Sequence, residues 1–165
     1  MRFESSLLHF IDRLYSLIIK IAGNLQSLFL LYMRLTWGYQ LMHMGWAKLR
    51  SIDTAIAYFA SLHFSHPVFD AYLAGAIEFL GGCCLFFGFA SRIACIPIAL
   101  LALAALSTAH APHISNFRFL LQPLSLVRQT PYPFLLTSLI IFIFGPGRIS
   151  IDGWLKRWSE KQPKY

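Results

Sequence analysis

Residues 71–110 read AYLAGAIEFLGGCCLFFGFASRIACIPIALLALAALSTAH, which is two apolar runs joined by a short turn. At about 1.5 Å of rise per residue, each run is long enough to cross most of a hydrocarbon core of about 30 Å. The turn at Gly88–Arg92 is tight, so the second run must return beside the first. This stretch predicts two adjacent transmembrane helices, Ala71–Phe89 and Ile93–His110.

Two further spans are predicted on either side of this pair. The first runs from about Gln26 to Trp46, and the fourth is a short one from about Phe134 to Phe144. Between the spans, residues 49–70 predict a short helix and a loop. Residues 111–132 predict a second long loop, because prolines prevent a continuous helix; they are Pro112 and Pro123, with Pro131 and Pro133 at its end.

The first 24 residues predict an amphipathic helix lying in the membrane interface. Its polar face carries His9, Arg13, Ser16 and Lys20 at helical spacing, and its other face is apolar. The expected fold is therefore all-α: an integral membrane bundle of four transmembrane helices with an N-terminal interfacial amphipathic helix. The expected parts are 1–24 for that helix, 25–155 for the bundle and 156–165 for a basic cytoplasmic tail.

Composition supports a lipid environment and argues against nucleic acid as a partner. Hydrophobic residues make up 57% of the chain and charged residues 13%, against about 25% charged in soluble domains. The net charge of +7 comes from basic residues that flank the apolar runs. Such placement suits lipid headgroups and topology control rather than a nucleic-acid surface with stacking aromatics.

The distribution of Lys and Arg predicts that both termini are cytoplasmic. Nine basic residues fall on one side of the predicted spans and four on the other. The nine are Arg2, Arg13, Lys20, Arg92, Arg148, Lys156, Arg157, Lys161 and Lys164, and the four are Lys48, Arg50, Arg118 and Arg128.

Arg34 and Glu78 are charged residues inside predicted spans, where a charge costs at least about 2.5–3.5 kcal/mol. Each lies on a stripe of small residues that suits close helix packing: Gly38 and Gly45 in the first span, Gly75 and Gly82 in the second. We expect both stripes to face the bundle interior. One interpretation is an Arg34–Glu78 ion pair that fixes helix register, with Lys48 and His43 as competing partners for Glu78. The other is a functional polar site that binds a quinone headgroup or relays protons.

Other side chains extend this predicted site or argue against a metal. The intramembrane polar site comprises Arg34, Glu78, Lys48 and His43, and a quinone or similar ligand would meet Arg34, Glu78, His43 and His110. Five histidines fall on the predicted outer side, where Met42 and Met44 would add soft metal ligands. The two methionines lie on different helical faces from His43, however, and His63 and His66 lie in loop-like sequence, so we predict no metal site. The three cysteines lack zinc-type spacing and are expected to be small buried residues.

Loop aromatics such as Tyr58, Phe59 and Phe64 form either an aromatic belt or the mouth of a pocket.

The segment 144–154, FGPGRISIDGW, ends the fourth span. Gly145 and Gly147 are expected to terminate the helix, and Ser150 and Asp152 follow them. We expect Asp152 to cap a short helix that starts at Gly153.

Taken in order, these residues resemble the DoxX family of small bacterial four-helix membrane proteins. The likeness spans about residues 25–155 and rests on Arg34, Gly38, Gly45 and Lys48, then Glu78-x-x-Gly81-Gly82 with Gly88 and Arg92, then Gly145-Pro146-Gly147-Arg148-x-Ser150-x-Asp152. The resemblance implies a multi-pass protein of the bacterial inner membrane. The positions that match the family's pattern of polar residues are Arg34, Lys48, Glu78 and Arg92.

The family's name comes from a membrane subunit of a thiosulfate:quinone oxidoreductase. The resemblance therefore implies a redox-linked membrane component that either handles a quinone, the one cofactor it suggests, or works with an oxidoreductase partner. Thiosulfate chemistry is not indicated, since no cysteine lies on the predicted outer face. One alternative is a non-catalytic subunit that anchors or assembles a partner complex, or a homo-oligomer. A small-molecule or metal transporter ranks below both, because four spans leave little room for alternating access.

Overall fold

The computed structural model describes residues 2–108, 127 and 129–160, and within them the chain forms helices and no strand. The helices are α1 (Arg2–Arg50), α2 (Ile52–Ser61), α3 (Pro67–Phe87), α4 (Ser91–Thr108), α7 (Pro131–Phe144) and α8 (Ile151–Glu160). The predicted loop 111–132 lies mostly outside the described residues. The all-helical prediction is confirmed.

Three of the described helices are long and apolar enough to cross a membrane: α1 from Asp12 onward, α3 and α4. The last two correspond to the spans predicted over residues 71–110. α7 begins at Pro131 rather than Phe134, since proline suits the first turn of a helix. Its 14 residues span about 21 Å, which is shorter than a hydrocarbon core, so a fourth crossing stays a prediction.

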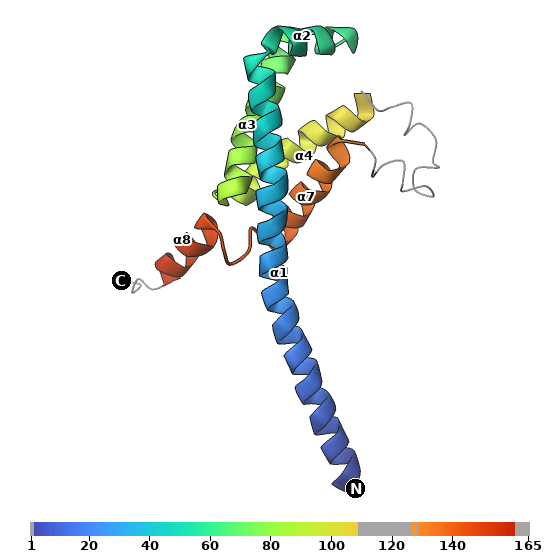
Figure 1. Ribbon diagram of the computed structural model, residues 1–165, viewed down its shortest axis with the longest axis vertical. Helices are drawn as coiled ribbons and strands as arrows, with labels where there is room; N and C mark the ends of the chain where they lie inside the picture. Colours follow the sequence, from blue (N-terminus) through green and yellow to red (C-terminus); the bar gives the residue numbers. More distant parts are fainter. Residues whose placement is uncertain (1, 109–126, 128, 161–165) are drawn as a thin grey trace.

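α1 is a single helix of 49 residues, or about 74 Å in length. The boundary expected near residue 24 is therefore not a break in the helix. Gly23 is the one glycine near that boundary, and an isolated glycine costs only about 1 kcal/mol in a helix. The second half of α1 runs beside α3, while the first half extends beyond the bundle (Figure 1). Large apolar side chains such as Leu14, Ile18 and Leu25 are exposed there.

α1 and α3 approach closely through glycines on their facing sides. A Cβ built on Gly82 would lie 2.9 Å from the carbonyl oxygen of Gly38, and one built on Gly45 would lie 2.8 Å from that of Gly75. These neighbours are backbone atoms, so they cannot rotate away. The small-residue stripes therefore meet along the interface.

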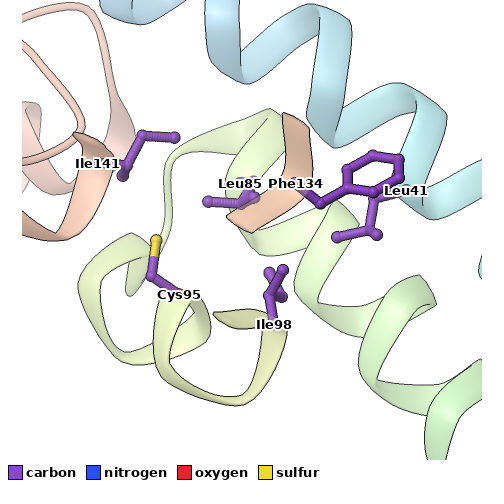
Figure 2. Packing of buried hydrophobic residues seen from close by; sticks show 6 residues of the cluster. All are labelled: Leu41, Leu85, Cys95, Ile98, Phe134 and Ile141. Atoms are coloured by element: carbon purple, nitrogen blue, oxygen red, sulfur yellow. The ribbon is translucent and has the colours of Figure 1, made fainter. Parts of the chain in front are cut away.

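α4 and α7 form the second closely packed helix pair. They join α1 and α3 in a shared core of Leu41, Leu85, Cys95, Ile98, Phe134 and Ile141 (Figure 2). Phe134 of α7 meets Trp37 of α1 edge to face, with ring centroids 5.7 Å apart. This core holds α7 against the other helices. Cys95 packs within it as a small buried residue.

Arg34 connects three parts of the chain at the end of the bundle where α3 stops. It is 2% exposed, and its guanidinium donates to the carbonyl oxygens of Leu85 (3.0 Å) and Phe86 (3.3 Å) in the last turn of α3. It also donates to the carbonyl oxygens of Pro146 (2.6 Å) and Ile149 (2.9 Å). A cation at a helix C-terminus is favourable electrostatically. Arg34 therefore binds backbone, and the alternative of an Arg34–Glu78 pair is not realised.

The α3–α4 turn is completed by the segment that follows α7. Gly88 ends α3 in the left-handed conformation, with φ of 71°, and its N–H donates to Cys84 and Leu85. The two carboxylate oxygens of Asp152 accept hydrogen bonds from the N–H groups of Ala90 (2.8 Å) and Ser91 (3.0 Å).

Asp152 thus caps α4, and the expected cap on a helix from Gly153 is wrong. Ser150 performs that function, since its hydroxyl accepts from the N–H of Gly153 at 2.9 Å and α8 begins at Ile151. A serine three residues before that N–H has the usual N-cap geometry. Asp152 lies inside the first turn of α8, where its carboxylate can reach across to the neighbouring turn.

We expect Gly45→Ala to destabilise the bundle by at least about 1–3 kcal/mol, because the added methyl meets backbone of α3 and forces the helices apart. The measurement is the midpoint of heat-induced unfolding in detergent. Gly23→Ala is the matched control, since nothing lies within 4 Å of a Cβ there. An unchanged midpoint for Gly45→Ala would contradict the close approach.

Arg34→Lys should lower the same midpoint almost as much as Arg34→Met. Lysine keeps the charge, but its single nitrogen cannot serve both the end of α3 and the 146–149 segment. Each lost charge-assisted hydrogen bond is worth about 1.5–3 kcal/mol. If Arg34→Lys matched the wild-type protein, charge alone would explain Arg34 and the bridging geometry would be irrelevant.

Candidate functional site

Glu78 lies near the middle of α3, on the face that packs against α1. It is 7% exposed, and the ammonium of Lys48 in α1 lies 2.5 Å from its Oε1 atom. The glycines Gly45 and Gly75 bring the two backbones close enough for this contact across the interface. Glu78 therefore pairs with Lys48, which was one of the two competing partners that the sequence offered.

The second carboxylate oxygen of Glu78 has no hydrogen-bond partner. Oε2 is buried, and it is one of three such orphaned side-chain atoms in the described part of the chain; the others belong to Ser91 and Thr137. A buried acceptor without a donor costs about 1–3 kcal/mol. An N–H or O–H group reaching this oxygen would recover that energy.

A cavity of about 560 Å³ reaches this ion pair. Its volume lies within the range of small-molecule sites, and its lining is mostly apolar, as such sites require. The charged side chains among the lining residues are Lys48, Asp70 and Glu78. α1, α2, α3, α4 and α7 all contribute to its walls, so the fold as a whole forms the cavity.

Aromatic side chains form one wall of the cavity. Tyr58 and Phe59 of α2 and the following Phe64 all line it. Phe59 stacks edge to face with both neighbours, at centroid distances of 5.9 Å to Tyr58 and 5.3 Å to Phe64. This cluster presents flat rings to an occupant, which fits the pocket-mouth alternative for the loop aromatics.

Among the described residues, the predicted site residues Arg34 and His43 lie away from the cavity. Arg34 binds the carbonyl of Leu85, which lies roughly 10 Å along α3 from Glu78. His43 is exposed and stacks on Tyr39 at a centroid distance of 6.3 Å. It lies five residues before Lys48, about 140° around α1, so it cannot share the face of Lys48. His110 lies outside the described residues.

The predicted glycines Gly145 and Gly147 shape the backbone after α7 and do not line the cavity. Gly145 and Gly147 adopt positive φ values of 82° and 84° at the end of α7. Among the residues that the structure describes, no three His, Cys, Asp or Glu side chains gather as a metal site would need.

Sequence reasoning missed two features of the site. Asp70, in the first turn of α3, lines the cavity although it reads as an ordinary residue at a helix start. The second feature is the pair of small residues Ala102 and Ala105 on α4, which line the cavity and leave space for it. A run of alanines in a predicted span was the available signal, but such runs also occur at helix contacts without cavities.

Comparisons with known proteins identify the family of this chain. The DoxX family model matches residues 29–111, which include Arg34, Lys48 and Glu78. The chain is also 32% identical over 110 residues to a protein of Bacillus subtilis (strain 168) named "Putative oxidoreductase CatD", covering 66% of this chain and 72% of that protein. No solved structure matches the chain with significant similarity. On the strength of the family match and this relative, the chain belongs to the DoxX family.

Proposed function

We propose that this protein is the membrane component of a quinone-linked oxidoreductase system, and that the cavity at Glu78 and Lys48 binds the quinone headgroup. The observation that carries the proposal is the buried, unpaired Oε2 of Glu78, a residue that lines a mostly apolar cavity. A partner oxidoreductase would exchange electrons with the bound quinone. The name of the Bacillus relative supports the class of reaction.

The ion pair offers both kinds of hydrogen bond that such a ligand needs. A quinone presents carbonyl oxygens, and the ammonium of Lys48 carries three donors, of which Glu78 Oε1 uses one. The reduced quinol presents hydroxyl groups, and Glu78 Oε2 would accept from one of them once the side chain turned this buried oxygen toward the cavity. Lys48 remains reachable, because its side chain is 31% exposed while that of Glu78 is 10% exposed.

The cavity walls suit the rest of the molecule. A quinone ring is flat and apolar on its faces, and the aromatic wall formed by Tyr58, Phe59 and Phe64 provides surfaces for stacking. The alanine-rich wall of α4 is apolar and could accompany an isoprenoid chain. A ligand of this kind would bury apolar surface and, in its quinol form, also donate a hydrogen bond to the unpaired Oε2 of Glu78.

The first half of α1 supports a second function, that of an anchor or assembly subunit. Its large apolar side chains are exposed over several turns, and a helix of about 74 Å exceeds any hydrocarbon core. Since α1 continues unbroken into its membrane-crossing half, we propose that it bends near Gly23 in the bilayer, so that residues 1–24 lie in the membrane interface with lipid on their apolar face. The same face could instead hold a partner subunit or another copy of the chain.

We propose that α7 is the fourth crossing and that both termini are cytoplasmic, in the bacterial inner membrane. The excess of Lys and Arg at the end of the bundle that holds Arg92 and Arg148 supports this orientation.

Quinone binding should depend on the ion pair and on the empty space. In mild detergent, decylubiquinone and menaquinone-4, each in oxidised and reduced form, should bind the purified wild-type protein at up to one per chain by equilibrium dialysis. Lys48→Met should weaken binding of the oxidised form by roughly tenfold, the equivalent of one hydrogen bond of about 1.4 kcal/mol. Glu78→Gln should weaken binding of the quinol more than that of the quinone.

Matched variants separate the site from general effects. Asp53→Asn and Arg50→Met make comparable changes outside the cavity lining and should bind normally. Ala105→Phe should block binding by filling the cavity while leaving the ion pair in place. If none of these quinones binds and a tightly held subunit co-purifies instead, the anchor function replaces the quinone site.

The orientation has a separate test. Green fluorescent protein fused after Tyr165 should fluoresce, and alkaline phosphatase at the same position should be inactive, because each reporter works on one side of the membrane only. The opposite pair of results would invert the topology without affecting the cavity.

A further inference from the structure

A second hollow is lined by residues of α1, the α3–α4 turn, the segment after α7 and α8. These elements meet at the opposite end of the bundle from α2 (Figure 1). The volume of this hollow is about 1180 Å³. We call it the basic groove, because five basic residues and one acidic residue line it. They are Lys20, Arg92, Arg148, Lys156, Arg157 and Asp152.

Five basic residues and one carboxylate leave the groove with a net positive charge. Both oxygens of Asp152 already accept hydrogen bonds from the backbone N–H groups of Ala90 and Ser91. Arg157 is held in place by carbonyl oxygens, since its guanidinium donates to Gly153 and to Arg148, each at 3.0 Å. The groove therefore keeps a positive field with part of its cationic surface held in a fixed position.

α8 indicates that the groove lies at the level of lipid headgroups. Ile151, Trp154, Leu155 and Trp158 recur on one side of this helix and are 40–60% exposed. Lys156 and Arg157 lie on the other side, toward the groove. A short helix with exposed tryptophans on one side and basic residues on the other is typical of the membrane interface.

Apolar side chains continue from the groove toward the bundle. Leu30 of α1, Ile93 of α4 and Phe144 of α7 line the same hollow. An occupant with an anionic head and a hydrocarbon tail would meet cations at one end and apolar walls at the other. A free inorganic anion would use only the first of these.

We propose that the basic groove binds the phosphate group of an anionic phospholipid, with its acyl chains along Leu30, Ile93 and Phe144. The lipid would join the projecting part of α1 to α8 through their shared positive charge. This proposal does not depend on the quinone cavity, because the two sites share no lining residue. Either can fail without the other.

The test compares two lipids on the delipidated full-length protein. Dioleoylphosphatidylglycerol and dioleoylphosphatidylcholine are titrated in mixed micelles, and bound lipid is counted by native mass spectrometry. Phosphatidylglycerol should bind more tightly to the wild-type protein. The double variant Arg92→Gln, Arg148→Gln should lose roughly ten- to thirtyfold of that affinity, as expected for two basic residues near an anionic headgroup.

The control double variant Arg13→Gln, Arg50→Gln removes the same charge outside the groove and should keep the selectivity. Equal losses in both double variants would reduce the effect to net charge and overturn the site. Equal binding of the two lipids, or competition by millimolar inorganic phosphate alone, would overturn the choice of an anionic phospholipid.

A measurement on the wild-type protein covers the case in which the variants fold poorly. Phosphatidylglycerol should slow hydrogen exchange of residues 147–157 more than phosphatidylcholine does, because the lipid would cover this segment. The same exchange rate in both lipids would contradict the proposal.

Discussion

Hydrocarbon offers no hydrogen bonds, so backbone that leaves a helix near the membrane must find its partners within the protein. In this chain the constraint falls on the α3–α4 turn and on the segment after α7. Arg34 donates to carbonyls of both, and Asp152 accepts from the N–H groups that open α4. One cation and one anion thus complete two helix ends, each at the terminus that its charge favours.

This use of Arg34 determines what remains for function. An arginine bound to four carbonyls has little freedom to meet a ligand, so the intramembrane charge left for chemistry is Glu78. Glu78 pairs with Lys48 through one oxygen only. A closed pair with both oxygens bonded would have indicated a purely structural role. A buried, orphaned oxygen on a residue that lines an apolar cavity is instead an arrangement that a ligand can complete.

The sequence predicts the helices and the facing glycine stripes well, because both follow from periodicity and from the solvent. The sequence predicts less well which groups each charged side chain contacts. Arg34 and Glu78 lie on stripes that face each other, yet register decides their contacts, and register depends on glycine-to-backbone distances that no pattern encodes. The same holds for Asp152, where a cap within its own helix is the local expectation and the observed partner is 61 residues away. His43 was offered as a partner for Glu78 beside Lys48, but it lies about 140° around α1 from Lys48, which excludes it.

The two ends of the bundle also differ in how they hold charge, and this difference argues for two kinds of ligand. In the cavity on the α2 side of the bundle, one cation and one carboxylate meet among mostly apolar side chains. This arrangement suits a neutral molecule with few polar atoms. At the α8 end, cations gather around a carboxylate already occupied by backbone, which suits an anion at the headgroup level. A membrane protein with a quinone at one end and a lipid at the other would use the reduced quinone to bond the open oxygen of Glu78 and the lipid to balance the positive charge of the groove.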